Sequence, residues 1–304
     1  MEFKGKSIIS IDDFSKEGIL KVLEVAAGLE ENPDTALFKD KLMAPLFYEP
    51  STRTRLSFVS AMERLGGQVD GFSSKDSSSV KKGESLWDTI KTVDNYVDII
   101  VIRHPLEGAA RLASEATEKP VVNAGDGANQ HPTQTLLDMY TIKKLFGSLE
   151  NLKIGMVGDL KYGRTVHSLV VAMSHFKPEF KFIAPEDLKM PEKYTDFLKQ
   201  NNIEYEEGEK LLPAINDLDI IYMTRIQQER FPDPMEYEKY KGVYQINTAS
   251  LKNVKENMKI LHPLPRVDEI VREVDDTSHA AYFEQVGNGI PIRQALIALT
   301  LGLR

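Results

Sequence analysis

The sequence predicts an α/β fold with two doubly wound domains, each with a central parallel sheet flanked by helices. Short runs of apolar and β-branched residues alternate with segments of helical periodicity along the chain. Strands that alternate with helices form parallel sheets, because each helix returns the chain across the sheet. The length of 304 residues also corresponds to about two domains.

Six runs are expected to be strands, at residues 41–48, 97–102, 152–159, 181–184, 220–224 and 258–261. An amphipathic helix predicted over residues 132–147 separates the first two of them from the others. Both of its ends are marked, because Pro132 lies in the first turn and Gly147 is a typical C-cap residue. Parallel sheets bind ligands at the carboxyl ends of their strands, so the residues that follow each run are the candidates for function.

The domain boundary is expected near this helix, over residues 140–151. Apolar residues at helical spacing predict a last helix over residues 291–303, and this spacing alone allows the helix to pack on either domain. We expect the first domain to comprise residues 1–140 and 288–304, and the second domain to comprise residues 141–287.

Composition excludes several classes of protein. Hydrophobic residues make up 41% and charged residues 28%, as in globular proteins, and no apolar run is long enough to cross a bilayer. The chain begins without the apolar segment of a secretory signal, so we expect a cytoplasmic protein. With 38 basic and 46 acidic residues, the net charge of −8 disfavours nucleic acid and anionic membranes as partners.

The content of metal-binding and nucleophilic residues is low. The chain has no Cys, which excludes disulfides, thiolate metal sites and a Cys nucleophile. Its six His are scattered and show no spacing typical of a metal site, so we expect neither a metal nor another cofactor. Catalysis would therefore have to use oxygen and nitrogen side chains.

A candidate anion site follows the first expected strand, where Ser51-Thr52-Arg53-Thr54-Arg55 opens a helix. Free backbone N–H groups and the helix dipole favour a phosphate there, and Arg adds charge-assisted hydrogen bonds. The alternative is a simple N-cap with surface Arg beside it. Three hydroxyls and two guanidiniums within five residues favour the phosphate. Arg53 and Arg55 cannot face the same way on a helix, so we expect only one to touch a ligand.

Two further candidates follow later runs of the first domain. Arg103 directly follows an apolar strand, a place where parallel sheets bind ligands, although a lone Arg there is often an ordinary strand-end charge. His131 and Gln134 follow a turn-rich loop at residues 123–129, at a helix start. A His beside helix N–H dipoles tends to stay neutral and can donate to a carbonyl oxygen; the alternative is a helix-cap residue.

The second domain repeats this arrangement of a strand followed by a glycine-containing loop. Gly155, Gly158 and Gly163 lie near one strand end, but their spacing does not match a dinucleotide fingerprint, so a nicotinamide-dependent dehydrogenase is disfavoured. Arg164 in the same loop indicates a carboxylate ligand, and Arg225 ends another apolar strand.

A proline-rich turn follows the last expected strand of the second domain. Pro263 and Pro265 lack N–H groups, which leaves backbone carbonyls that could accept hydrogen bonds from an amide-like NH₂. His262 is expected to be structural and to satisfy a backbone group at the strand end.

Together these segments resemble the signatures of the aspartate/ornithine carbamoyltransferase family, from residue 8 to the end of the chain. The motifs are Ser51-Thr-Arg-Thr-Arg55, Arg103-His-Pro105, Asn129-Gln-His-Pro-Thr-Gln134, Gly158-Asp-Leu-Lys-Tyr-Gly-Arg-Thr165, Tyr222-Met-Thr-Arg-Ile-Gln227 and His262-Pro-Leu-Pro-Arg266. The last three resemble the aspartate branch, since the ornithine enzymes typically carry Cys in the final motif.

The resemblance implies a transferase that moves the carbamoyl group of carbamoyl phosphate to L-aspartate, an early step of pyrimidine biosynthesis. The products would be N-carbamoyl-L-aspartate and phosphate. Alternatives are another transcarbamylase, such as an ornithine carbamoyltransferase, and a non-catalytic anion-binding relative. The resemblance also implies a homotrimer whose sites lie between subunits, and it leaves open separate regulatory chains.

The resemblance further implies residue roles. The phosphate would be held by Ser51, Thr52, Arg53 and Thr54. The carbamoyl carbonyl would be addressed by Thr54, Arg103 and His131. The carbamoyl NH₂ would be held by Gln134 and by the turn of Pro263, Leu264 and Pro265. The aspartate carboxylates would be bound by Arg164, Arg225 and Gln227. Ser78 and Lys82 would arrive from a neighbouring subunit, on a polar segment of residues 73–83 that we expect to be a mobile loop.

Overall fold

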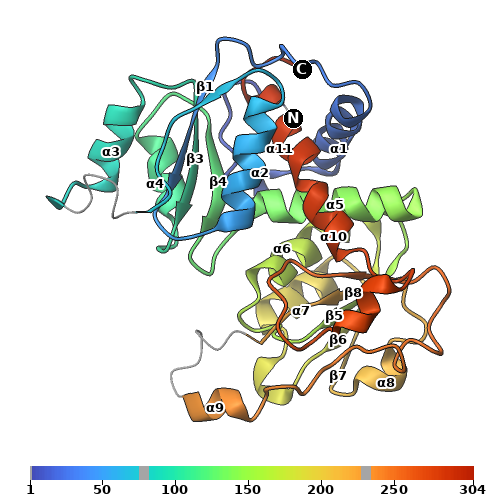
Figure 1. The fold of residues 1–304 in the computed structure, drawn as a ribbon. Helices are drawn as coiled ribbons and strands as arrows, with labels where there is room; N and C mark the ends of the chain where they lie inside the picture. The colour runs from blue at the N-terminus through green and yellow to red at the C-terminus, as the bar shows by residue number, and fades with distance from the viewer. Residues whose placement is uncertain (1, 75–81, 227–233) are drawn as a thin grey trace. The chain divides into compact units, whose positions relative to one another are not determined.

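The computed structural model describes residues 2–74, 82–226 and 234–304, which form two compact units (Figure 1). The first unit comprises Met1–Tyr140 and Gly287–Arg304, and the second comprises Thr141–Val286. The chain leaves the first unit within helix α5 (Pro132–Phe146) and returns to it at the end of α10 (Tyr282–Gly287). The first residue of the returning segment is 287, where the sequence suggests 288.

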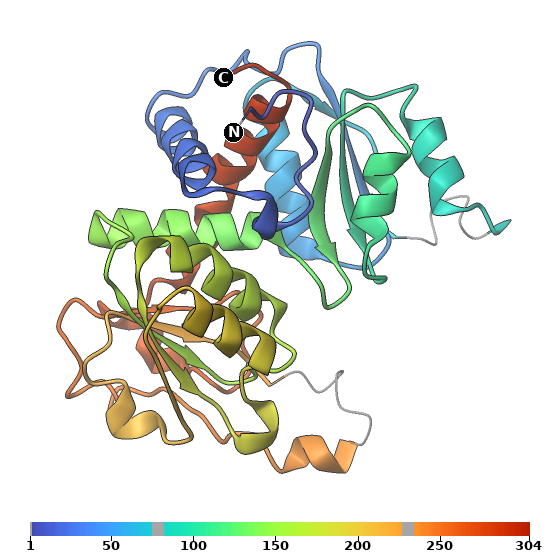
Figure 2. The same cartoon turned by 180° about the vertical axis from the view of Figure 1, so that it is seen from behind.

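The first unit contains a parallel sheet of four strands in its described residues, in the order β2-β1-β3-β4. The strands are β1 (Leu42–Phe47), β2 (Gln68–Val69), β3 (Ile99–His104) and β4 (Val121–Asp126). The helices are η1 (Ile11–Asp13), α1 (Lys16–Glu31), α2 (Thr52–Glu63), α3 (Leu86–Val93), α4 (Ala109–Glu115) and α11 (Gly289–Thr300). Figure 1 shows α3 and α4 on one face of this sheet and α2 with α11 on the other; Figure 2 shows the same arrangement from behind.

The second unit contains a parallel sheet of five strands in its described residues, in the order β7-β6-β5-β8-β9. The strands are β5 (Lys153–Val157), β6 (Glu179–Ile183), β7 (Tyr205–Gly208), β8 (Ile220–Met223) and β9 (Lys259–Leu261). The helices are α6 (Arg164–Met173), η4 (Ser174–Phe176), η5 (Glu186–Leu188), α7 (Glu192–Gln200), α8 (Leu211–Ala214), α9 (Pro234–Glu238) and η7 (Arg272–Asp276).

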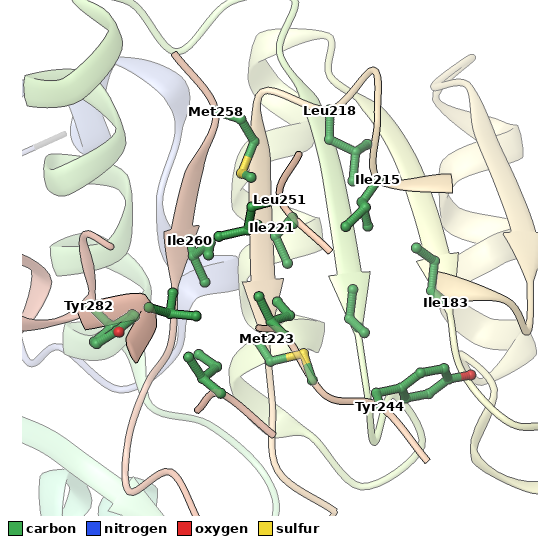
Figure 3. Close-up of a cluster of buried hydrophobic side chains, with 14 residues drawn as sticks. Ile183, Ile215, Leu218, Ile221, Met223, Tyr244, Leu251, Met258, Ile260 and Tyr282 are labelled. Atoms are coloured by element: carbon green, nitrogen blue, oxygen red, sulfur yellow. The ribbon is translucent and has the colours of Figure 1, made fainter. Parts of the chain in front are cut away.

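A buried apolar cluster holds one face of this second sheet. Ile221 and Met223 of β8 and Ile260 of β9 project into it, together with Tyr244 from the segment between these strands and Tyr282 of α10 (Figure 3). Apolar side chains buried in this way supply most of the free energy that stabilises a sheet against its covering segments. The cluster fixes the position of the strand ends that carry the candidate residues of this unit.

The expected α/β class with two doubly wound parallel sheets is confirmed, and each of the six expected runs contains a strand. The strands β2, β4 and β7 were not predicted. Strand β7 has an exposed burial pattern and lies at the edge of its sheet, so it lacks an apolar signal. The prediction of a turn-rich loop over residues 123–129 was wrong at its start, because Asn123 to Asp126 belong to the fully buried strand β4.

The last helix begins earlier than predicted. Helix α11 starts at Gly289, so Pro291 lies in its first turn, where a missing N–H group costs no hydrogen bond. It packs against α1 and α2 of the first unit. In the described part of the chain, no helix is both long and apolar enough to cross a membrane.

Candidate active site

Each sheet has a point where the strand order reverses, and these points select the strand ends that matter. In the first unit, β1 lies between β2 and β3; in the second, β5 lies between β6 and β8. Helices leave such a sheet on opposite faces at the reversal, so a crevice forms at the carboxyl ends of the two strands. The residues Ser51 to Thr54 and Arg103 lie at the ends of β1 and β3, and Arg164 and Arg225 follow β5 and β8. His131 and Gln134 follow β4, and the proline-rich turn follows β9.

Helix α2 starts a short loop after β1 and has no side-chain cap at its N-terminus among the described residues. Its N-cap is Ser51, whose side chain makes no cap hydrogen bond in the described structure, and the first turn contains no acidic residue. Thr52 and Arg53 are exposed, and Thr54 is buried with 8% of its surface accessible. A helix start that has hydroxyls around it and no side-chain cap is suited to an anion, because the backbone N–H groups and the helix dipole favour negative charge there.

Arg103 lies near the carboxyl end of the neighbouring strand β3. Its Nη1 donates to the carbonyl of Ala124 at 3.1 Å, and its Nη2 lies 2.7 Å from Glu49 Oε1. Its Nε is buried and has no hydrogen-bond partner among the described residues. Burial lowers the pKa of the Arg103 guanidinium, Glu49 opposes this shift, and the charge of Arg53 lowers the pKa further. A bound anion would offset the repulsion between the guanidiniums of Arg53 and Arg103 and would give the Nε–H group of Arg103 an acceptor.

The loop before His131 is held by Asp126, the last residue of β4. The buried carboxylate of Asp126 accepts hydrogen bonds from the backbone N–H groups of Gly108 at 2.9 Å and Gln130 at 3.1 Å. It also accepts from the side chains of Asn123 at 2.9 Å and Asn129 at 3.1 Å. These bonds fix the path of the chain into α5, so Asp126 is a supporting residue of the site that the sequence interpretation missed.

His131 and Gln134 lie at the beginning of α5. His131 is buried at 5% exposure, and its Nδ1 lies 3.4 Å from the Thr133 hydroxyl. Gln134 is half-buried, and its Nε2 donates to Asp138 Oδ1 at 2.8 Å. The strand register pairs Phe47 of β1 with Arg103 of β3, so the first unit gathers its candidates at one edge of its sheet.

In the second unit, Thr224 ties the two central strand ends together. Its hydroxyl donates to the carbonyl of Val157 at 3.1 Å and accepts from the N–H group of Asp159 at 3.1 Å. Gly158 between them has φ +115°, and a Cβ there would come within 2.3 Å of the Thr224 carbonyl. Only glycine therefore allows this approach, which brings the loop before Arg164 beside Arg225.

A pocket in the second unit lies next to this junction. It is lined by Thr224 and Arg225 on one side and by Tyr237, Tyr244 and Glu269 on others. Arg164 and Arg225 are both half-buried. Guanidiniums at adjacent strand ends are suited to a ligand that carries more than one carboxylate.

The proline-rich turn is held from behind by a buried pair. His262 Nδ1 accepts from the N–H group of Leu264 at 2.8 Å, and Nε2 lies 2.7 Å from Glu269 Oε1. Burial lowers the pKa of His262, so the neutral ring donates from Nε2 to Glu269. The expectation that His262 satisfies a backbone group is confirmed. The half-buried Pro263 and Leu264 therefore keep their carbonyls as acceptors, with the exposed Pro265 beside them.

Some expected residues are not placed. Ser78 and Gln227 lie outside the described residues, as does most of the expected mobile loop; Lys82, at its far end, is described and exposed. Within residues 2–74, 82–226 and 234–304, no three His, Asp or Glu side chains are grouped closely enough to hold a metal ion.

Comparison with known families and proteins agrees with the motifs. Residues 6–144 match the carbamoyl-P binding domain of the aspartate/ornithine carbamoyltransferases, and residues 150–300 match their Asp/Orn binding domain. The aspartate carbamoyltransferase catalytic subunit of Thermococcus onnurineus is 59% identical, over 100% of this chain and 99% of that protein. The corresponding subunit of Thermococcus kodakarensis is 60% identical over the same shares.

Solved structures show the same similarity. The catalytic subunit of M. jannaschii aspartate transcarbamoylase is 52% identical, with a TM-score of 0.90 over 97% of both chains. The aspartate transcarbamoylase of Trypanosoma cruzi, in complex with carbamoyl phosphate and aspartate, is 38% identical, with a TM-score of 0.92 over 98% of both chains.

Proposed function

The chain belongs to the aspartate/ornithine carbamoyltransferase family, and from this premise we propose that it transfers the carbamoyl group of carbamoyl phosphate to L-aspartate. The products are N-carbamoyl-L-aspartate and phosphate, which places the reaction early in pyrimidine biosynthesis. The observation that carries the proposal concerns Arg103. Its Nε is buried and has no hydrogen-bond partner among the described residues, and it lies beside the start of α2, which has no side-chain cap.

The first unit binds carbamoyl phosphate. Arg53 and the hydroxyls of Ser51, Thr52 and Thr54 surround the N–H groups at the start of α2 and hold the phosphate. Arg103 and His131, with Thr54, donate to the carbamoyl oxygen. Gln134 accepts from the carbamoyl NH₂. The family resemblance gives the same role to the carbonyls of the Pro263–Leu264–Pro265 turn, which belongs to the second unit.

The second unit binds L-aspartate through Arg164 and Arg225, with Gln227. Two guanidiniums match the two carboxylates of aspartate. Ornithine instead reacts through its side-chain amine and presents one carboxylate and a cationic α-amine, which the second guanidinium would repel. The positive charges of Arg164 and Arg225 therefore favour aspartate over ornithine.

The reaction needs no covalent intermediate with the protein. The aspartate amine attacks the carbamoyl carbon, a C–N bond forms, and the bond from carbon to the phosphate oxygen breaks. Thr54, Arg103 and His131 stabilise the negative charge that develops on the carbonyl oxygen, and the departing phosphate takes the amine proton. Positioning and preorganised donors account for most of the rate enhancement.

Two other hypotheses explain less of the site. A non-catalytic anion-binding protein has no need of donors and acceptors around a carbonyl group in addition to the phosphate site. A dehydrogenase would require glycine spacing that the β5 loop lacks. A transfer assay that offers aspartate and ornithine side by side distinguishes these functions.

We further propose a cytoplasmic homotrimer in which Lys82 enters the site of a neighbouring subunit. Lys82 is exposed, and the segment before it is almost entirely polar. The relatives are named catalytic subunits, which supports separate regulatory chains as partners.

Subunit exchange tests the shared site. Lys82→Ala and Arg53→Ala chains are each expected to be inactive, whereas a one-to-one exchanged mixture should recover activity at about one quarter of its sites, because those sites receive both native residues. Each variant exchanged with itself is the control. Exchange verified by native mass spectrometry without recovered activity would show that each site is complete within one chain.

A further inference from the structure

Two charged side chains lie deep in the first unit without a part in the chemistry above. Asp138 of α5 is fully buried, and Arg293 of α11 is 3% exposed. Burying ions is costly unless they are paired and hydrogen-bonded, so such residues are retained for a reason other than simple packing.

Arg293 is held firmly in one place. Its Nη1 donates to Ser57 Oγ of α2 at 2.6 Å, and its guanidinium lies over the Phe58 ring, 4.8 Å from the centroid. A Cβ on Gly289 would come within 2.2 Å of Nη1, so glycine leaves the room for this side chain. Burial lowers the pKa of Arg293 to about 9 and Asp138 opposes this shift, so the guanidinium stays positive at neutral pH.

Asp138 lies one helical turn after Gln134, on the same face of α5. Its Oδ1 accepts from Gln134 Nε2 at 2.8 Å. The two ends of a Gln amide are nearly equal in size, so its orientation is set by its hydrogen bonds. A carboxylate only accepts, and it therefore forces the NH₂ of Gln134 inward and leaves Oε1 as the end available to a ligand.

We propose that Asp138 is a positioning residue for carbamoyl transfer, which fixes Gln134 as an acceptor for the carbamoyl NH₂ while Arg293 serves as the buried counter-charge. The inference rests on the proposed function. It adds a reason for substrate choice: an oriented acceptor favours a carbamoyl group over an acetyl group, whose methyl donates no hydrogen bond.

Asp138→Asn is the decisive change, because it keeps the size of the side chain. An amide at position 138 can donate as well as accept, so it no longer forces the NH₂ of Gln134 inward and the Gln134 amide is free to reverse. We expect kcat/KM for carbamoyl phosphate to fall about 10-fold, the worth of one hydrogen bond near 1.4 kcal/mol. Inhibition by acetyl phosphate, which lacks the NH₂, should stay unchanged.

A double-mutant cycle separates positioning from general structural damage. Gln134→Ala alone should cost about the same 10-fold, and Asp138→Asn should add no further loss in its presence. Tyr140→Phe is the matched control on the same helix, because it removes a 2.6 Å bond to Glu30 and leaves Gln134 untouched; its effect should be independent of Gln134→Ala. Independent effects of Asp138→Asn and Gln134→Ala, or equal weakening of acetyl phosphate, would overturn the proposal.

A double substitution provides a second test for the case of misfolding. If Asp138→Asn does not fold because Arg293 loses its counter-charge, the Asp138→Asn/Arg293→Met pair removes both charges, and Gln134→Ala is then added to it. No further loss supports positioning, and a further 10-fold loss contradicts it. Wild-type protein without carbamoyl transfer would refute the proposed function itself, whereas an active wild type with independent mutational effects refutes only the role of Asp138.

Discussion

Arg53→Ala is expected to lower carbamoyl transfer by about 10³-fold or more, because it removes a charge-assisted donor from the proposed phosphate site at the start of α2. The exposed position of Arg53 means that the fold should survive, so thermal unfolding should stay close to that of the wild type. Steady-state kinetics with varied carbamoyl phosphate measure the effect.

Arg64→Ala is the matched control for this change. Arg64 is an exposed arginine at the other end of the same helix, where it forms the C-cap of α2. The Arg64→Ala substitution removes one positive charge from the first unit and leaves the proposed anion site unchanged. Near-normal turnover of Arg53→Ala, or an equal loss of activity in both variants, would disprove the assignment of a phosphate site to the start of α2.

His131→Ala should act on the chemical step. A neutral imidazole donor helps most when the carbonyl oxygen becomes negative, so we expect kcat to fall roughly 10² to 10³-fold with little change in KM. His104 provides a control at the same sheet edge, since its Nδ1 is already occupied by the N–H group of Leu106 at 3.0 Å. If His131→Ala instead raised KM and left kcat unchanged, His131 would bind the ground state of the substrate rather than stabilise the transition state.

The central strands could be predicted, and the segment of the proposed phosphate site could be selected, because their signals are local. Strand β3 is an unbroken apolar run, and Ser51 to Arg55 concentrate hydroxyls and guanidiniums at one predicted helix start. Edge strand β7 has no such signal, because little of it is buried. Pattern alone therefore identified the middle of each sheet and the edge strand β9, and missed the edge strands β2, β4 and β7.

The supporting residues of the site could be predicted only in part. Asn123 and Asp126 were interpreted as turn residues, although they use their side chains to organise the loop from within a buried strand. Gln134 and Asp138 stand four residues apart on one helix, which was an available signal. The bond between Arg293 and Ser57 joins residues 236 positions apart, and no local pattern predicts it.

The central claim is that this chain carbamoylates aspartate, and transfer of label from carbonyl-labelled carbamoyl phosphate tests it most directly. With aspartate and ornithine offered in parallel at equal concentration, and Arg53→Ala as the blank, we predict that label appears in N-carbamoyl-L-aspartate and is absent from carbamoylated ornithine. Label in the ornithine product, or in neither product, would contradict the account.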